Sequence, residues 1–150
     1  MEQVKTISNE TLKKVLHDVC VCEGYVDEFM EKTSAKALKE ELKSFLFRLQ
    51  TARKSLNAYL IVKRGDDQKA SQSSYLQDWM KEFKKCLMDS SQDYMKELKK
   101  MLQQYQKQVS SILHGASIYD PQLHRILHIL YDDYAAAIYC FDRYLVTMNK

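Results

Sequence analysis

Apolar residues recur along this chain at alternating spacings of three and four, which is the period of an amphipathic helix. Four long segments show the pattern, and each has one apolar stripe and one polar face. Short polar stretches separate these segments. The pattern predicts helices over residues 8–30, 34–63, 92–113 and 121–148, with a shorter fifth helix over residues 75–88.

The ends of these segments carry the residue types that begin and end helices. Ser8 or Asn9 can cap the first helix at its N-terminus, and Ser34 can cap the second. Gly65 follows a basic last turn, as expected beyond a helix C-terminus. Asp120 and the proline after it form a strong helix start, because proline suits the first helical position.

The lengths of the connections predict how the helices are arranged. Residues 31–33 form a very short linker, which makes the first two helices antiparallel neighbours. Residues 66–74 contain no apolar side chain larger than alanine and begin a long middle connection. We therefore predict an all-α four-helix bundle over residues 1–150, a single domain of two antiparallel hairpins. A long crossover containing the short fifth helix joins the hairpins.

The composition agrees with helices and excludes several other classes. The chain has 150 residues, of which only 3 are glycine and 1 is proline. An all-β sandwich or barrel needs a turn every few residues, and this chain lacks the turn formers. Hydrophobic residues make up 45% of the chain, enough for a core, so disorder throughout is excluded.

Charge and cysteine content bear on partners and location. The net charge is +3, and basic and acidic residues are evenly mixed, so we expect no nucleic-acid partner. The chain has no signal-peptide pattern and no apolar run long enough to span a membrane, and we expect a cytoplasmic protein. In that compartment we expect reduced thiols at all four cysteines, which are Cys20, Cys22, Cys86 and Cys140.

A bundle with a long crossover raises the question of a di-iron site, which needs two glutamates and two Glu-x-x-His pairs. Glu23 is directed toward the apolar stripe, but neither His124 nor His128 follows a glutamate three residues earlier. Glu23 is then either a carboxylate at the core edge, satisfied by a tyrosine, Arg53 or water, or a metal ligand. In the second case it would join His124 or His128 in binding iron, manganese or zinc. Separately, His124, His128 and Asp132 share one helix face at i, i+4 and i+8.

Other motifs point away from common enzymes and toward association. The chain has no G-x-S-x-G, Walker or G-x-G-x-x-G motif, which argues against most common enzyme classes. Five of its ten tyrosines lie on or near the last predicted helix. Tyr131, Tyr134 and Tyr139 spread round more than one face of that helix, either as core-edge residues or as a contact with a partner. We predict that these three belong to an interface with a second copy or another protein.

Three short motifs carry a family resemblance. The first helix contains Leu16-His-Asp-Val-Cys-Val-Cys-Glu23-Gly24-Tyr25, the second Ala37-Leu38-Lys-Glu-Glu-Leu42-Lys-Ser-Phe45, and Trp79-Met80-Lys-Glu-Phe83 follows. Their order resembles an uncharacterised bacterial family of ferritin-like single-domain proteins, a domain of unknown function, over most of residues 10–145. The resemblance implies a ferritin-like four-helix bundle and no established activity. It carries over only Glu23 as a metal candidate, because the Glu-x-x-His pairs are missing.

Taken together, these features predict a non-enzymatic helical-bundle protein that acts by self-association or by binding a protein partner. A metal-binding ferritin-like protein is one alternative. A binder of a small molecule, with its cavity near Gly24, is the other.

Overall fold

The computed structural model describes residues 7–66, 91–115 and 120–148. Within these residues there are four helices and no strand: α1 (Asn9–Lys32), α2 (Lys36–Arg64), α4 (Ser91–Gly115) and α5 (Pro121–Met148). Each end of the four long predicted helices lies within two residues of the observed end. The fifth helix predicted over residues 75–88 lies outside the described residues.

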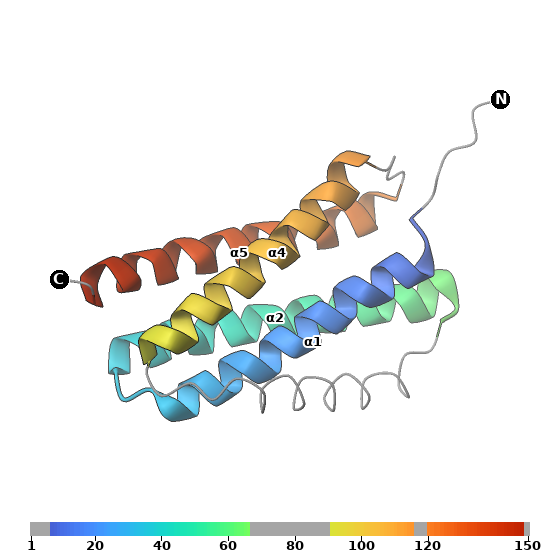
Figure 1. The fold of residues 1–150 in the computed structure, drawn as a ribbon. Coiled ribbons are helices and arrows are strands. Elements are labelled where there is room, and N and C mark those ends of the chain that lie inside the picture. Colours follow the sequence, from blue (N-terminus) through green and yellow to red (C-terminus); the bar gives the residue numbers. More distant parts are fainter. Residues whose placement is uncertain (1–6, 67–90, 116–119, 149–150) are drawn as a thin grey trace.

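The four helices form two antiparallel hairpins (Figure 1). In the first hairpin α1 packs against α2, and in the second α4 packs against α5. The hairpins meet through α1 on α4 and α2 on α5, which places α1 and α5 on opposite corners of the bundle. This arrangement confirms the predicted all-α bundle. None of the described helices combines the length and the apolar run needed to cross a membrane.

The predicted apolar stripes form the core. Every helix contributes side chains that are almost completely removed from solvent, and these make one continuous cluster. Its members include Leu12, Val19, Phe29, Leu42, Leu49, Leu56, Leu98, Leu102, Leu127, Tyr134 and Phe141. Aromatic contacts join the hairpins: Phe45 meets Phe141 edge to face with ring centroids 6.4 Å apart, and the Tyr25 hydroxyl donates to the Tyr94 carbonyl oxygen at 3.1 Å. Burial on this scale is the main force that stabilises the bundle.

The helix ends agree with the predicted signals in all but one place. The Ser8 hydroxyl accepts from the Thr11 backbone N–H at 3.2 Å, and Gly65 adopts the left-handed conformation with φ 62°. The prediction that Ser34 caps α2 is wrong, because the cap position is Ala35 and no side chain bonds there. Thr33 explains the shift: its backbone N–H closes α1 by donating to the Phe29 carbonyl oxygen, and its hydroxyl accepts from the Ala35 N–H.

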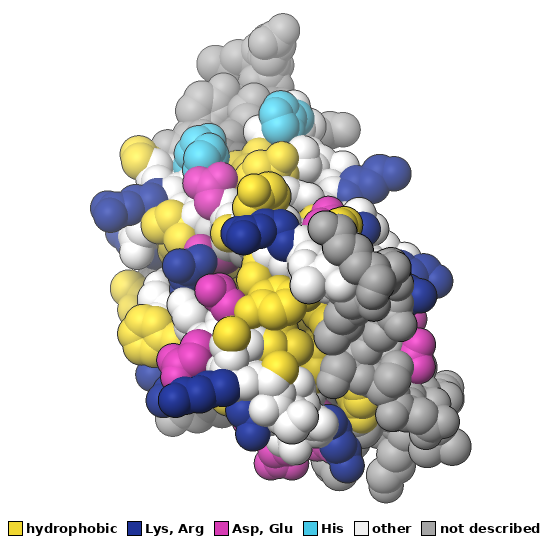
Figure 2. All heavy atoms as spheres, turned by 90° about the vertical axis from the view of Figure 1, so that its left-hand side faces the viewer, with side chains coloured by type: hydrophobic (Ala, Val, Ile, Leu, Met, Phe, Trp, Pro, Cys, Tyr) yellow, Lys and Arg dark blue, Asp and Glu magenta, His cyan; other side chains and the backbone are white. Residues whose placement is uncertain are grey.

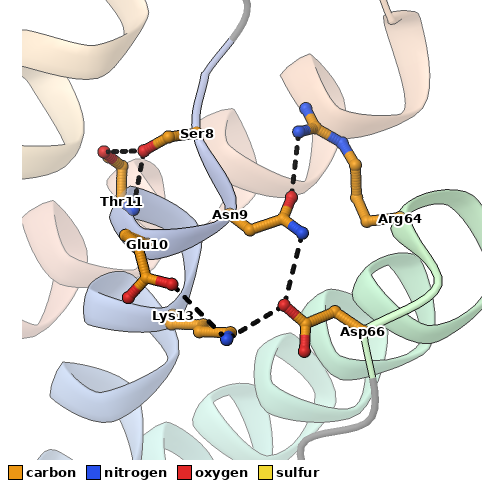
Figure 3. Close-up of polar contacts among 7 residues, drawn as sticks. All are labelled: Ser8, Asn9, Glu10, Thr11, Lys13, Arg64 and Asp66. Carbon is orange, nitrogen blue, oxygen red and sulfur yellow. Dashed lines mark hydrogen bonds and ion pairs between the residues drawn. The ribbon is translucent and has the colours of Figure 1, made fainter.

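A polar clasp joins the start of α1 to the end of α2 (Figure 3). Arg64 donates to the Ile7 carbonyl oxygen at 2.8 Å and to Asn9 Oδ1 at 3.1 Å. Asn9 in turn donates to Asp66 Oδ2 at 3.2 Å, and Lys13 Nζ lies 3.0 Å from the same oxygen. These bonds satisfy polar groups at the helix ends, where backbone N–H and C=O groups have no hydrogen-bond partner within the helix.

The same end of the bundle also includes the start of α5. The Arg64 guanidinium lies over the Tyr59 ring, 5.8 Å from its centroid. The Tyr59 hydroxyl donates to Asp120 Oδ2 at 2.8 Å, while Asp120 Oδ1 accepts from the Gln122 backbone N–H at 2.9 Å. One network therefore links α1, α2 and α5, and it caps α5 as the sequence predicted.

Candidate functional site

Glu23 lies on α1 facing α2, where it forms an ion pair with Arg53. Arg53 Nε donates to both carboxylate oxygens, at 2.8 and 3.1 Å, and only 14% of the Glu23 side chain is exposed. Burial raises the pKa of Glu23, and the Arg53 charge opposes that rise. Of the two interpretations of Glu23, the structure matches the core-edge carboxylate whose partner is Arg53.

The two candidate histidines lie on an exposed face of α5. The His124 and His128 rings are stacked, with centroids 6.0 Å apart and planes inclined by 26°. His128 Nδ1 lies 3.3 Å from Asp132 Oδ2, one helical turn further along. The predicted face of His124, His128 and Asp132 is therefore present, and its side chains point away from the core.

The structure does not bring Glu23 together with the histidines. Glu23 is on α1 and the histidines are on α5, and these helices lie diagonally across the bundle without close approach of their backbones. Among the described residues, no group of three or more His, Cys, Asp or Glu side chains is placed to hold a metal ion. The described part of the chain therefore offers no third ligand of these types beside His124 and His128.

The three tyrosines proposed for an interface have three different environments. Tyr139 is 66% exposed, and the Arg143 guanidinium lies 5.9 Å from the centroid of its ring. Tyr131 is half-buried against the core. Tyr134 requires a correction: it is completely buried in this chain, so it has no surface to offer a partner. It belongs to the apolar stripe of α5, and its ring packs against Tyr105 with centroids 6.2 Å apart.

Sequence reasoning missed a groove between α2 and α5. Three adjoining hollows of about 220, 80 and 330 Å³ follow the contact between these helices. The first is mostly apolar, and its lining residues are Phe47, Arg48, Thr51, Ala52, Ser55, Ile126, Ile129 and Asp133. Phe47 is 69% exposed and Ile129 is 48% exposed, although both are large and apolar. Apolar residues that fall outside the core stripe, as these two do, are the signal that points to the groove.

The far end of the groove is polar. Glu41, Cys140, Arg143, Tyr144 and Thr147 line the hollow of 330 Å³. Burial, reinforced by the nearby Glu41 charge, raises the pKa of the Cys140 thiol to about 11. A thiol with such a pKa stays protonated at neutral pH, so Cys140 is a poor nucleophile here.

The surface near this end combines apolar and charged side chains. Figure 2 views the bundle from the end where α5 finishes and α2 begins, and hydrophobic side chains form an exposed band there. Basic and acidic side chains lie to the left of the band in Figure 2. A hydrophobic centre with a mixed-charge border is the usual anatomy of a protein–protein contact.

Two further groups in the interior bear on chemistry. Cys20 and Cys22 are buried free thiols, and burial raises the pKa of Cys20 to about 12 and raises that of Cys22 well above its usual range. Asp18, which sequence reasoning missed, is a buried carboxylate whose Oδ1 accepts from Lys14 Nζ at 2.7 Å. Its position three residues after Val15 was the available signal, because i and i+3 share a helix face.

The chain was compared with known proteins at the levels of family, sequence and structure. No protein-family model, curated protein or solved structure matches it. The α2–α5 groove, the Glu23–Arg53 pair and the histidine face are therefore the features from which its function is proposed.

Proposed function

We propose that this protein is a non-enzymatic, ferritin-like helical bundle that associates with a second copy of itself through the α2–α5 groove. The observation that carries the proposal is the apolar hollow of about 220 Å³ beside the exposed Phe47 ring. The ferritin-like part of the proposal is supported by the two antiparallel hairpins and by the positions of α2 and α4, since α2 ends and α4 begins at opposite ends of the bundle (Figure 1).

A projecting ring and a hollow on the same surface become complementary when a two-fold axis relates two copies. In such a dimer residue i contacts j while j contacts i, so each Phe47 can enter the hollow of the other copy. The charges at the rim obey the same logic. Arg48 on α2 and Asp133 on α5 line opposite sides of the hollow, so each can face its opposite charge in the second copy.

The size of the surface fits a stable dimer. The groove extends along α5 from Ile126 to Thr147, which at 1.5 Å per residue is about 33 Å. Two adjacent helices present a face about 20 Å wide, since packed helix axes lie about 10 Å apart. The face of one copy is then roughly 660 Å², and a dimer would bury roughly 1,300 Å², within the range of specific interfaces. Tyr139 lies next to this face through its contact with Arg143 and can extend the interface.

Sedimentation velocity of the full chain tests the proposal. We expect a monomer–dimer equilibrium at chain concentrations between about 1 and 200 µM, which spans binding free energies of about −8 to −5 kcal/mol. The Phe47→Asp variant should be a monomer over the same range. Val62→Asp is the matched control, because Val62 is 76% exposed on α2 but does not line the groove. A monomeric wild-type chain, or a Phe47→Asp variant that still dimerises, would refute the proposal.

Metal binding is the second candidate function, and the exposed histidine pair is the observation that favours it. Glu23 is a poor ligand in this arrangement because Arg53 already occupies both of its carboxylate oxygens. A metal bound at Glu23 would have to displace a charge-assisted pair, which is among the stronger polar interactions in proteins. The histidine pair has no such competing cation among its described contacts.

A further inference from the structure

The exposed face of α5 carries a pair of imidazoles that the proposed dimer does not use. His124 and His128 are one helical turn apart, with ring centroids separated by 6.0 Å and planes inclined by only 26°. Both side chains are exposed, and 56% of the His128 side chain is accessible to solvent. Neutral imidazole is a preferred ligand for zinc and related divalent ions.

The spacing of the two rings fits one shared ion. A zinc–nitrogen bond is about 2.1 Å long, and a ring nitrogen lies about 1.1 Å from the ring centre, so one ion reaches centroids about 3.2 Å away. Two rings bound to the same ion are therefore at most about 6.5 Å apart, centroid to centroid. The observed 6.0 Å is within that limit. At the tetrahedral angle the two centroids would be about 5.2 Å apart, so the rings have to approach each other by about 0.8 Å to bind one ion.

Asp132 positions the second ring for this role. Its Oδ2 lies 3.3 Å from His128 Nδ1, so the carboxylate favours a proton on Nδ1 and leaves the Nε2 lone pair available to a metal. Carboxylate–histidine–metal chains of this kind fix the tautomer and raise the basicity of the ligating ring. Along α5, the two ligands His124 and His128 are therefore followed by Asp132, the group that orients His128.

The histidine face and the groove lie on different sides of α5. At about 100° per residue, His128 is turned roughly 100° away from Ile129, and Ile129 lines the apolar hollow. Among the described residues no third His, Cys, Asp or Glu is placed to complete a metal site. We propose that His124 and His128 form a surface binding site for one Zn²⁺ ion, with Asp132 orienting His128 and with the open positions filled by water or by a donor from another molecule.

Isothermal titration of the full chain with zinc chloride, after removal of metals with a chelator, tests this site. We expect saturable binding of one Zn²⁺ per chain, which both His124→Ala and His128→Ala abolish. Asp132→Ala should raise the dissociation constant about 10- to 100-fold, the usual effect of removing a group that orients a ligand. His114→Ala is the matched control and should bind normally, because His114 is exposed on α4 and its Nδ1 lies 2.8 Å from the Ser110 carbonyl oxygen.

Far-UV circular dichroism of each variant separates loss of the site from loss of the fold. Thermal unfolding gives a second readout, because an ion that binds the folded state raises Tm in proportion to the logarithm of its concentration. That rise should appear in the wild-type chain and be absent in folded His124→Ala. One ion per two chains, still abolished by either substitution, supports the pair and identifies a second copy as the donor. Absence of saturable binding, or binding that survives both substitutions, overturns the proposal.

Discussion

Replacing Tyr134 by phenylalanine should make this protein more stable, although a buried aromatic side chain is being altered. Tyr134 is completely buried in the core, and within the described residues its hydroxyl has no hydrogen-bond partner. Burial of a hydroxyl without a partner costs about 1–3 kcal/mol in protein mutational data. Burial also raises the pKa of Tyr134 well above its usual range, so the hydroxyl remains neutral.

The magnitude follows from two opposing contributions. Removal of the hydroxyl recovers the desolvation cost of about 1–3 kcal/mol. The oxygen leaves a space of roughly 15 Å³, which at about 24 cal/mol per Å³ costs roughly 0.4 kcal/mol. The free energy of unfolding should therefore rise by about 0.5–2.5 kcal/mol. For a chain of this length each kcal/mol corresponds to about 2–4 °C in Tm, so a rise of roughly 3–6 °C is the central expectation.

Tyr25 supplies a matched control of opposite sign. It is also buried, but its hydroxyl donates to the Tyr94 carbonyl oxygen at 3.1 Å. Tyr25→Phe should lower the free energy of unfolding by about 0.5–1.5 kcal/mol, the net value of such a bond. Urea unfolding followed by circular dichroism at pH 7 measures both variants, and equal m-values establish that the unfolded states are comparable. A Tyr134→Phe variant that is less stable than wild type would show that the hydroxyl is bonded in solution and would refute the reasoning.

Three further predictions concern polar and backbone contributions to stability and are tested by urea unfolding. Arg53→Met should lower the free energy of unfolding by about 1–3 kcal/mol at pH 7, because it leaves a half-buried carboxylate unpaired, and adding Glu23→Gln should restore part of the loss. For Asp18, burial raises the folded-state pKa, so the stability it contributes is present below about pH 3.9 and is lost as the pH rises through the folded pKa. As the pH rises from 3 to 7, the free energy of unfolding of Asp18→Asn should therefore increase relative to that of wild type. A decrease relative to wild type over that interval would contradict this account. Gly65→Ala should cost about 1 kcal/mol from its φ of 62° alone, since an added Cβ meets nothing within 4 Å, whereas Gly115→Ala should be close to neutral.

The helices were predictable because the spacing of apolar residues that indicates a helix recurs over many turns of each one. In the first predicted helix, the six apolar positions that alternate at spacings of three and four are all buried: Leu12, Val15, Val19, Cys22, Val26 and Phe29. The start at Ser8 and the stop at Gly65 depend on single residues, yet their chemistry is local and therefore readable. The error at Ser34 has a different origin. The Thr33 hydroxyl bonds to the backbone across the short linker, and nothing in the spacing of apolar residues reveals which of two adjacent hydroxyl side chains will do so.

The candidate site was less predictable because it depends on how separate helices meet. The sequence allowed a tyrosine, Arg53 or water as the partner of Glu23. Arg53 is 30 positions away along the chain, and only the packing of α1 on α2 brings its side chain to Glu23. Likewise, the groove exists because Phe47 of α2 and Ile129 of α5 come together along a contact between the two hairpins. Tyr134 was predicted to belong to an interface, although its spacing along the last helix also places it in phase with the apolar stripe. Its burial shows that the stripe was the better guide, because a position in phase with the core has no surface to share.

Three consecutive residues of α5 show why the proposals for this protein can be tested separately. Asp132 is 62% exposed beside the histidine pair, Asp133 lines the apolar hollow, and Tyr134 is in the core. Each step along a helix turns the side chain by about 100°, so neighbours in sequence lie on different faces. Neither His124 nor His128 lines the apolar hollow, and neither Phe47 nor Ile129 belongs to the histidine pair. Loss of zinc binding in a folded dimer, or loss of dimer in a chain that still binds zinc, would therefore assign each activity to its own face of a single helix.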